Sequence, residues 1–557
     1  MGKRKPLIFF LVITIVIASL FLAAPVLINW YLNQNADRIV SNMITRTNDF
    51  AGHDVNFGDI EIDYNFQGTF LHLKEVEIFP GDQISGKDMI RFNLSFDAAS
   101  LTGFSWLDFL LNNSIQLDSA YIENVNLTSE TPPLEEPEDG DVQEETPEGK
   151  DYNIISVTHL RINKVSFENR DSYTDSTRIS IQDLFVFADD FRLTKEDRES
   201  RNALFSVNSI EGYMAQAVFH LNDYRNTVMA NDFSFNTIEK TMAIEKVAFQ
   251  NKLDKYEYIN EFEKETNWME LKNGKLEVEG MDFQSYFRKG QIVADSLLLM
   301  GLDLEVFRDK RKTEDTARRP KMIHEILQEL PKQINISEII IDDAYISYEE
   351  RPDTKAPRAG KIYFDQVNGK ISRFTNFEAL LNEDDKMEVK AKGNLIGQGT
   401  IDLEVTYFLK DESGKFLMKG KVGSMDLRAL NPMIEPATRV ALKNGTLNEL
   451  YLDITADDNE GTGQVIAKYQ DLEIEILDKN YQNNQNILRR IGAFLANKIV
   501  VPSFNPTKDG ELKKGDVYFQ REKHKFIFNY WWELVLSGLK STVTGDTEAD
   551  MRKNAAD

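Results

Sequence analysis

The sequence predicts a mainly β protein that begins with a transmembrane helix and carries a few amphipathic helices, notably near its carboxyl end. Three observations support this fold class. An uncharged apolar run lies at the amino terminus. Through most of the body, apolar residues alternate with polar ones in short segments, and helical periodicity is confined to a few segments. Together they indicate a β-rich body that is attached to a membrane.

The apolar run extends over residues 7–28 without a charged side chain. As a helix, about 22 residues span roughly 33 Å, which is enough to cross a bilayer. Lys3, Arg4 and Lys5 precede the run and predict a cytoplasmic amino terminus with an exported body. The alternative is a cleaved signal peptide, but the run is longer than a signal-peptide core and Ala23-Ala24-Pro25 is a poor cleavage site. We therefore expect an uncleaved anchor.

Charge and composition exclude several classes of function. The 557 residues include 91 Asp and Glu against 65 Lys and Arg, for a formal net charge of -26. Such a surface repels phosphate backbones, so no nucleic acid partner is expected. The chain contains no Cys, which excludes disulfides, thiolate metal sites and thiol nucleophiles. Its length allows two or three structural units, or one elongated unit.

An internal repeat is the most informative pattern in the chain. Apolar residues recur at offsets 0, 2, 5, 7, 10 and 12, and turn-prone pairs such as Glu123-Asn124 and Asp342-Asp343 occupy the second three-residue step. Pairs at period two that are separated by three-residue steps predict strands whose inward face is restored after a bulge or tight turn. The four copies are Ile115, Leu117, Ala120, Ile122, Val125 and Leu127; Ile155, Val157, Leu160, Ile162, Val165 and Phe167; Ile292, Ala294, Leu297, Leu299, Leu302 and Leu304; and Ile334, Ile336, Ile339, Ile341, Ala344 and Ile346.

Three segments have helical periodicity, namely residues 323–330, 487–499 and 528–539. In the last of these, the large apolar residues are Phe528, Trp531, Trp532, Val535 and Leu539. This helix is interpreted first as a core helix, with a plug or a membrane-interface helix as alternatives. By contrast, residues 129–150 are acidic and proline-rich and are expected to form a disordered loop.

No constellation of residues predicts an enzyme. The six His residues are dispersed without metal-ligand spacing, and no phosphate-binding, nucleophile-elbow or dinucleotide motif is present. Acidic pairs such as Asp342-Asp343 are better explained as solvated turn residues than as a general acid and base. We expect no catalytic residue, no metal and no cofactor.

The repeat places many aliphatic side chains on one side of a long sheet, and this face needs a cover. One possibility is a second sheet that closes a dry sandwich. The other is a curled sheet whose inner face forms an apolar groove. Periodicity does not separate these possibilities, because both require the same alternation of residues.

Several degenerate motifs carry a family resemblance over nearly the whole chain. They include the basic start and anchor, the strand at residues 68–78, the apolar stretch at 101–111, and the late segments 397–403, 427–432 and 443–447. With these features the chain resembles the AsmA-like family of anchored periplasmic proteins, which are related to bridge-like lipid-transfer proteins. The stretch 505–538 is similar to Bacteroidetes-type members. At 557 residues, the chain is shorter than the relatives that are taken to span the envelope.

The resemblance implies an elongated, curled antiparallel sheet that forms a periplasmic β-groove. It implies phospholipid as the partner, the inner membrane as the site of anchoring, and transport or homeostasis of lipid between the two membranes as the function. The candidate groove residues are then eighteen of the repeat positions, namely Ile115, Leu117, Ile122, Leu127, Ile155, Val157, Leu160, Ile162, Val165, Phe167, Leu297, Leu299, Leu302, Leu304, Ile336, Ile339, Ile341 and Ile346. The alternative function is a non-enzymatic assembly factor that contacts envelope proteins during outer-membrane biogenesis.

The expected organisation follows from these patterns. We expect a cytoplasmic tail at residues 1–6, the anchor at 7–29, an amino-terminal β region at 30–128 and the acidic loop at 129–150. A repeated β-groove region is expected at 151–480, a helical piece with short strands at 481–545, and a disordered tail at 546–557.

Overall fold

The computed structural model describes residues 26–556, except 46–51, 66–67, 82–90, 133–151, 200–204, 222–223, 354–355, 479 and 482–500. Strands make up 58% of the structure, which confirms the mainly β fold class. The chain divides into two compact units. Unit 1 comprises residues 1–224, 229–242 and 283–290, and unit 2 comprises 225–228, 243–282 and 291–557.

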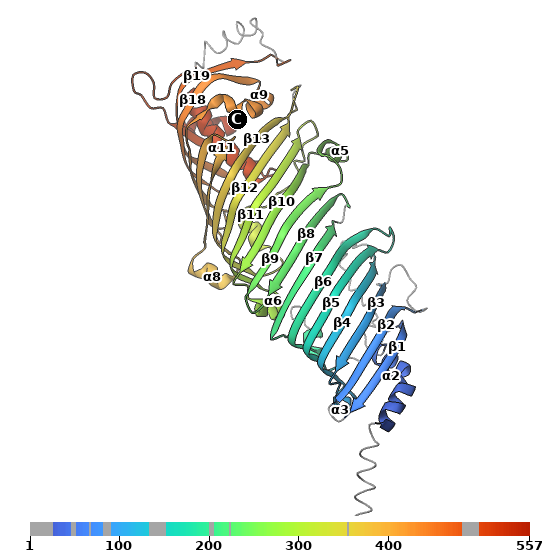
Figure 1. The fold of residues 1–557 in the computed structure, drawn as a ribbon. Helices are drawn as coiled ribbons and strands as arrows, with labels where there is room; N and C mark the ends of the chain where they lie inside the picture. Colours follow the sequence, from blue (N-terminus) through green and yellow to red (C-terminus); the bar gives the residue numbers. More distant parts are fainter. Residues whose placement is uncertain are drawn as a thin grey trace, which may run out of the picture. The chain divides into compact units, whose positions relative to one another are not determined.

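Unit 1 is built on seven strands that pair in chain order (Figure 1). The strands are β1 (His53–Asn65), β2 (Gly68–Pro80), β3 (Arg91–Thr102), β4 (Ser114–Thr131), β5 (Ile154–Asp171), β6 (Thr177–Thr194) and β7 (Ser209–His220). Its helices are α2 (Ala36–Thr45), α3 (Trp106–Asn112), α4 (Lys195–Glu199) and α6 (Phe283–Lys289). The boundary between the units falls within β8 (Asn226–Asn236) and at the start of β9 (Thr241–Asn251).

Unit 2 continues with the same architecture. Its strands are β10 (Asn267–Glu279), β11 (Ile292–Asp309), β12 (Ile334–Arg351), β13 (Gly360–Thr375), β14 (Lys386–Leu395), β15 (Gly399–Phe408), β16 (Phe416–Val422), β17 (Met425–Asp426), β18 (Val440–Ala456), β19 (Glu460–Ile476) and β20 (Gly515–Gln520). Its helices are α5 (Lys255–Asn260), α7 (Ile323–Gln328), α8 (Glu378–Glu383), η2 (Leu427–Leu430), α9 (Asn431–Thr438), α11 (Ile527–Thr544) and α12 (Glu548–Ala556).

The four repeat copies are four strands of equal length. β4, β5, β11 and β12 each have 18 residues, and they pair as β4 with β5 and β11 with β12. The two pairs keep the predicted frame in register, so that Ile115 faces Ile155 and Leu297 faces Ile339. Both pairs are parallel, whereas the sheet was predicted to be antiparallel throughout. Antiparallel pairs dominate the rest of the sheet, so the antiparallel prediction holds for most of it.

A left-handed residue marks the second three-residue step in every copy. Asn124, Lys164, Gly301 and Asp343 have φ angles of 53°, 55°, 59° and 50°. This conformation inserts one extra residue and turns the following side chains back to the original face. The step is therefore a bulge inside one long strand, in agreement with the predicted restoration of the inward face.

Two of the three predicted helices lie among the described residues. Residues 323–330 correspond to α7 and 528–539 to α11, whereas 487–499 lie outside the described residues. The expected disordered tail is wrong for its main part, because Glu548–Ala556 form α12. Arg552 of α12 makes ion pairs with Glu548 and with Glu460 of β19, and these contacts hold the helix. Most of the predicted acidic loop lies outside the described residues, and its first residues, 129–131, complete β4.

No described helix is long and apolar enough to span a bilayer. The predicted anchor lies almost wholly outside the described residues, which begin at Val26. Residues 26–34 are helical and lead into α2, a helix that was not predicted. Leu32, Ala36 and Val40, at a spacing of four residues, were the signal for it.

Candidate apolar binding face

One face of the sheet in each unit carries the repeat positions, and we call it the inner face. In unit 1, cross-strand neighbours on this face form continuous apolar rows. One row joins β1 to β6 through Ile60, Leu73, Ala99, Ile122, Ile162 and Val186. The next joins β1 to β7 through Ile62, Leu71, Leu101, Ala120, Leu160, Ala188 and Ile210. Neighbouring strands lie about 4.8 Å apart, so successive side chains in a row are in contact range.

The inner face of unit 2 has the same construction. One row joins eight strands, β10 to β16 and β18, through Val278, Leu297, Ile339, Ile371, Val389, Val405, Met418 and Ile454. A parallel row contains Leu276 of β10, Leu299 and Ile341 from the repeat strands, and Leu403 and Leu452 farther along. Period-two alternation was the only sequence signal for the members outside the repeat copies.

The predicted groove residues are mostly half-buried. Val157, Ile336 and Ile339 are buried. The others keep part of their surface exposed, namely Ile115, Leu117, Ile122, Leu127, Ile155, Leu160, Ile162, Val165, Phe167, Leu297, Leu299, Leu302, Leu304, Ile341 and Ile346. Within the described part of each unit, no second sheet covers them. A closed sandwich of two sheets is therefore not the arrangement of these residues.

Helix α2 covers the inner face of unit 1 over its first strands. Leu32, Ala36 and Val40 pack with Ile62, Leu73, Val76, Ile78 and Ala99, all of which are buried. Ile122 of β4 lies at the margin of this cluster and is half-buried. The covered core therefore passes without interruption into the half-exposed rows of β4 to β6.

The carboxyl-terminal end of the inner face in unit 2 is covered by α11 and α7. Leu534 of α11 and Leu327 of α7 are buried in one cluster with Val405, Met418 and Ile454. The covered end of the row is therefore the less exposed one, because Leu297 is half-buried whereas the exposed fraction of Ile454 is 0%. The helix lies very close to the sheet, because a Cβ on Gly538 would approach Val465 Cγ2 to 2.5 Å. Figure 1 shows α11 beside β18 and β19.

The predicted residues of the terminal helix lie on the flank of α11 rather than on its buried face. Trp531 packs against Phe416 of β16, with ring centroids 6.4 Å apart. Phe528 and Trp532 are exposed by 68% and 44%. Val535 and Leu539 are half-buried against the core. An aromatic and aliphatic flank of α11 thus stands next to the covered end of the inner face.

Polar side chains end the apolar rows at one end of the repeat strands. In unit 1, Arg178 forms an ion pair with Asp171, the last residue of β5, and donates a 3.0 Å hydrogen bond to Thr131 of β4. Burial opposes ionisation of Asp171, but hydrogen bonds from the Thr174 and Tyr173 N–H groups and from Arg178 outweigh it and lower the pKa to about 2. This carboxylate is therefore charged at neutral pH.

Unit 2 has a comparable polar end. Arg308 of β11 donates a 2.8 Å hydrogen bond through Nε to Glu265, and the two side chains are only 15% and 7% exposed. Tyr348 donates a 2.7 Å hydrogen bond to Glu350. Burial, followed by the nearby Glu350, raises the pKa of Tyr348 far above its usual range. These groups are paired, and their arrangement offers no activated acid or base.

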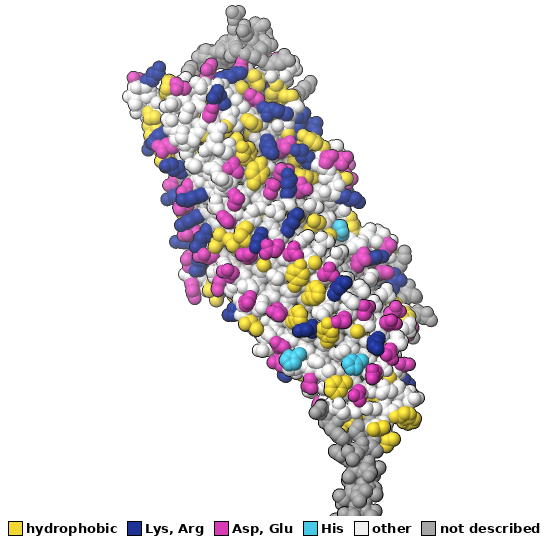
Figure 2. All heavy atoms as spheres, in the orientation of Figure 1, with side chains coloured by type: hydrophobic (Ala, Val, Ile, Leu, Met, Phe, Trp, Pro, Cys, Tyr) yellow, Lys and Arg dark blue, Asp and Glu magenta, His cyan; other side chains and the backbone are white. Residues whose placement is uncertain are grey.

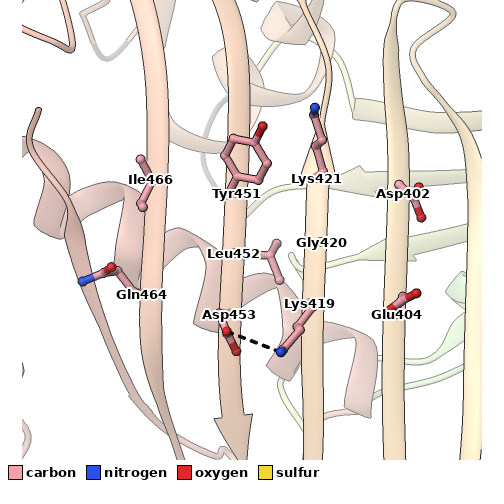
Figure 3. Close-up of a pocket in the computed structure, with 10 residues that line it drawn as sticks. All are labelled: Asp402, Glu404, Lys419, Gly420, Lys421, Tyr451, Leu452, Asp453, Gln464 and Ile466. Atoms are coloured by element: carbon pink, nitrogen blue, oxygen red, sulfur yellow. Dashed lines mark ion pairs between the residues drawn. The ribbon is translucent and has the colours of Figure 1, made fainter.

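The opposite face is charged. Figure 2 shows acidic and basic side chains interspersed over the strands. In unit 2 they form ion pairs across strands, such as Lys392 with Asp402 at 3.2 Å and Lys419 with Asp453 at 3.8 Å. A shallow hollow of about 420 Å³ opens above Gly420, between these side chains and Tyr451 (Figure 3). Because it is open and charged, it does not suit an apolar ligand.

A second hollow, of about 400 Å³, lies on the corresponding face of unit 1. His159 and Asp189 form a hydrogen bond of 2.9 Å at its border, and Arg161 lies over the Phe187 ring at 4.6 Å. Among the described residues, no group of three or more His, Asp or Glu side chains is placed to hold a metal ion. The inner face is therefore the candidate functional surface.

Comparison with known proteins gives no assignment. No family model matches the chain, and no curated protein matches it.

Proposed function

We propose that this protein is a membrane-anchored, non-enzymatic envelope protein that holds phospholipid acyl chains on the inner face of its sheet and passes them along it. The observation that supports this proposal is the set of unbroken apolar rows, whose large side chains stay half-exposed because no second sheet among the described residues of either unit covers them. Acyl chains are the ligand that such a face suits, because they need apolar cover without directional bonds.

The energetics favour holding and sliding over fixed binding. Each methylene removed from water contributes roughly 0.8 kcal/mol, whichever aliphatic side chain it contacts. Along each row, apolar side chains recur at every strand, about 4.8 Å apart, and present similar sites in succession, so movement from one strand to the next meets no large barrier. The proposed location is the periplasmic side of the inner membrane, with lipid supplied where the chain is anchored.

A photo-crosslinker placed on either face of one strand tests the proposal. Leu299 lies on the inner face of β11, and its neighbour Leu298 lies on the opposite face, so the two positions are matched in residue type and strand. With p-benzoylphenylalanine at these positions, we expect mass spectrometry to detect phospholipid adducts at 299 and few at 298. Equal labelling, or no lipid at 299 and none in the purified protein, would refute the proposal.

A charged substitution provides the functional test. Leu299→Asp places a carboxylate among half-buried side chains and is expected to reduce lipid transfer between vesicles several-fold, whereas Leu298→Asp is expected to leave it nearly unchanged. Ile339→Asp should act in the same direction, but Ile339 is only 7% exposed, so its loss of folding stability must be measured alongside. If crosslinkers on the charged face captured envelope proteins while position 299 captured no lipid, the assembly-factor alternative would replace this proposal.

A further inference from the structure

The end of unit 1 at which β1 ends and β2 begins bears two exposed apolar elements. In the helical segment 26–34, Val26, Leu27, Trp30 and Tyr31 are exposed by 68%, 60%, 66% and 58%. In α3, Leu111 is exposed by 78%. α3 follows the end of β3 and leads into the start of β4, whereas the helical segment adjoins the end of β1. Both elements therefore stand at the same end of the strands (Figure 1).

Two asparagines fix the helical segment to the free edge of β1. Asn33 accepts a 2.9 Å hydrogen bond from the Ile62 N–H and donates one of 2.6 Å to the Ile62 carbonyl. Asn29 accepts from the Tyr64 N–H at 2.5 Å and donates to Asp63 Oδ1 at 2.8 Å. The Asn33 amide thus makes the two bonds that a neighbouring strand would make. We call Asn29 and Asn33 the asparagine clamp.

The clamp determines which side of the segment is free. Asn29, Leu32 and Asn33 face the sheet, and Leu32 is only 8% exposed. The outward residues between Val26 and Tyr31 are aliphatic or aromatic, and Gln34 is exposed beyond them. The sequence has no charged residue between Lys5 and Asp37. Trp and Tyr are the residues that favour the boundary between hydrocarbon and water.

We infer that this end of unit 1 docks on a lipid bilayer, with residues 26–31 and Leu111 in the interfacial layer and the asparagine clamp holding β1 against it. The inference rests on the proposed anchoring and acyl-chain role. It adds an orientation, because the ends of β1, β3 and the start of β4 then face the membrane and the rows covered by α2 begin at the lipid source.

The nature of the contact follows from its side chains. Asp63 and Asp108 lie in the same region, and hydrogen bonds from Ser105 and then Asn112 lower the pKa of Asp108, so it stays charged. No attraction to anionic headgroups is available from these residues, and docking is driven by apolar contact. Docking should therefore change little between 50 and 500 mM salt, unlike the docking of a basic patch.

Single-cysteine labelling of the full chain tests the docking, since the protein has no Cys of its own. An environment-sensitive fluorophore is attached to Leu111→Cys or to Leu221→Cys in protein reconstituted into phosphatidylethanolamine–phosphatidylglycerol vesicles. Leu221 is also exposed, by 41%, but follows β7 at the opposite end of the strands, roughly 50 Å away at about 3.3 Å per residue. Spin-labelled acyl chains should quench the probe at 111 at least threefold more than the probe at 221. Equal quenching would overturn the inference, as would contact with a second copy or another protein without quenching at 111.

The clamp has its own test. Asn33→Leu removes both hydrogen bonds to Ile62 and should increase amide exchange at Ile62 and Tyr64 and halve the quenching at 111. Asn42→Leu is the matched control, because Asn42 donates a 2.6 Å hydrogen bond to the Arg38 carbonyl of its own helix and not to β1 among the described residues. If Asn33→Leu behaves like Asn42→Leu, the clamp has no positioning role. Lipid capture at position 299 without quenching at position 111 would contradict the docking inference and leave the proposed function standing. Quenching at 111 without lipid capture at 299 would support docking and contradict the proposed function.

Discussion

At the scale of single residues, the repeated strands depend on positions at which the backbone turns left-handed. Asn124, Lys164, Gly301 and Asp343 occupy equivalent bulges in four strands. Asp and Asn tolerate this conformation better than other non-glycine residues, and β-branched residues tolerate it worst. The bulge residues, rather than the aliphatic ones, therefore keep both halves of each strand facing the same side.

Asp343→Val is expected to cost about 1–2 kcal/mol of unfolding free energy, because a β-branched residue is strained at a φ of 50°. The neighbouring Asp342 is exposed and lacks a positive φ, so Asp342→Val should change stability by less than about 0.5 kcal/mol. The midpoints of urea unfolding, measured for both variants and the unmodified protein, test this difference in stability. Equal effects would show that the bulge conformation does not limit the choice of residue.

The pair of Asp171 and Arg178 predicts a pH dependence. The pKa of Asp171 is lowered from 3.8 to about 2 in the folded protein, so the unfolded chain takes up its proton first as the pH falls. The stabilising contribution is complete above about pH 4 and is lost between pH 4 and pH 2. Asp171→Asn should lose roughly 3 kcal/mol at pH 7, because it leaves Arg178 without its anion. The variant should also lack the wild-type decline in that pH range, as measured by chemical denaturation.

At the scale of elements, α11 covers the sheet through small residues that permit close approach. Buried positions on this helix include Ser537, Gly538 and Ser541. A side chain at Gly538 would meet Val465 and Val517 at 2.5–2.9 Å. Gly538→Ala should therefore reduce the unfolding free energy by about 1–3 kcal/mol, despite the better helix propensity of Ala.

Lys540→Ala on the exposed side of α11 serves as the control and should change stability by less than about 0.5 kcal/mol. Thermal or urea unfolding followed by Trp fluorescence reports both variants, because Trp531 and Trp532 lie on this helix. A stabilised Gly538→Ala variant would mean that the helix can move away from β19 without loss of packing.

The helices and strands also show how much of the fold could be predicted from the sequence. Repeat positions were predicted to share a face, and they do so in register, because the period of two and the bulge residues are local features. Parallel pairing was not predictable, since parallel and antiparallel strands have the same side-chain alternation. α12 was missed because a helix of nine residues without an apolar stripe is marginal by itself, and its contact with Glu460 is tertiary.

For the candidate site, the sequence predicted the aliphatic lining but not its coverage. Alternation shows which residues share a face, and only the fold shows what lies over that face. α2 over Leu73 and α11 over Ile454 bury the two covered regions, whereas Ile122 and Leu297 remain half-exposed. The polar ends built on Asp171 and Arg308 were likewise not predicted, because Arg178 also bonds to Thr131 and Arg308 bonds to Glu265, and both of these contacts join residues distant in sequence.

At the scale of the whole molecule, the half-exposed inner faces make folding and ligand binding interdependent. Apolar surface that stays in contact with water in the folded protein gives up part of the stabilisation that burial would supply. An acyl chain that binds the folded state and not the unfolded state recovers it by mass action, with about 2.7 kcal/mol gained at a free ligand concentration of one hundred times Kd.

Phosphatidylglycerol carrying two short acyl chains, used below its micelle concentration, is therefore expected to raise Tm by several degrees and to displace a hydrophobic fluorescent dye from the protein. Glycerophosphoglycerol, the same headgroup without acyl chains, should do neither. Leu299→Asp should weaken both effects of the lipid, and Leu298→Asp should leave them intact, because only the former changes the inner face. Stabilisation by the headgroup alone would instead place recognition on polar groups and would contradict the assignment of the apolar rows as the binding surface.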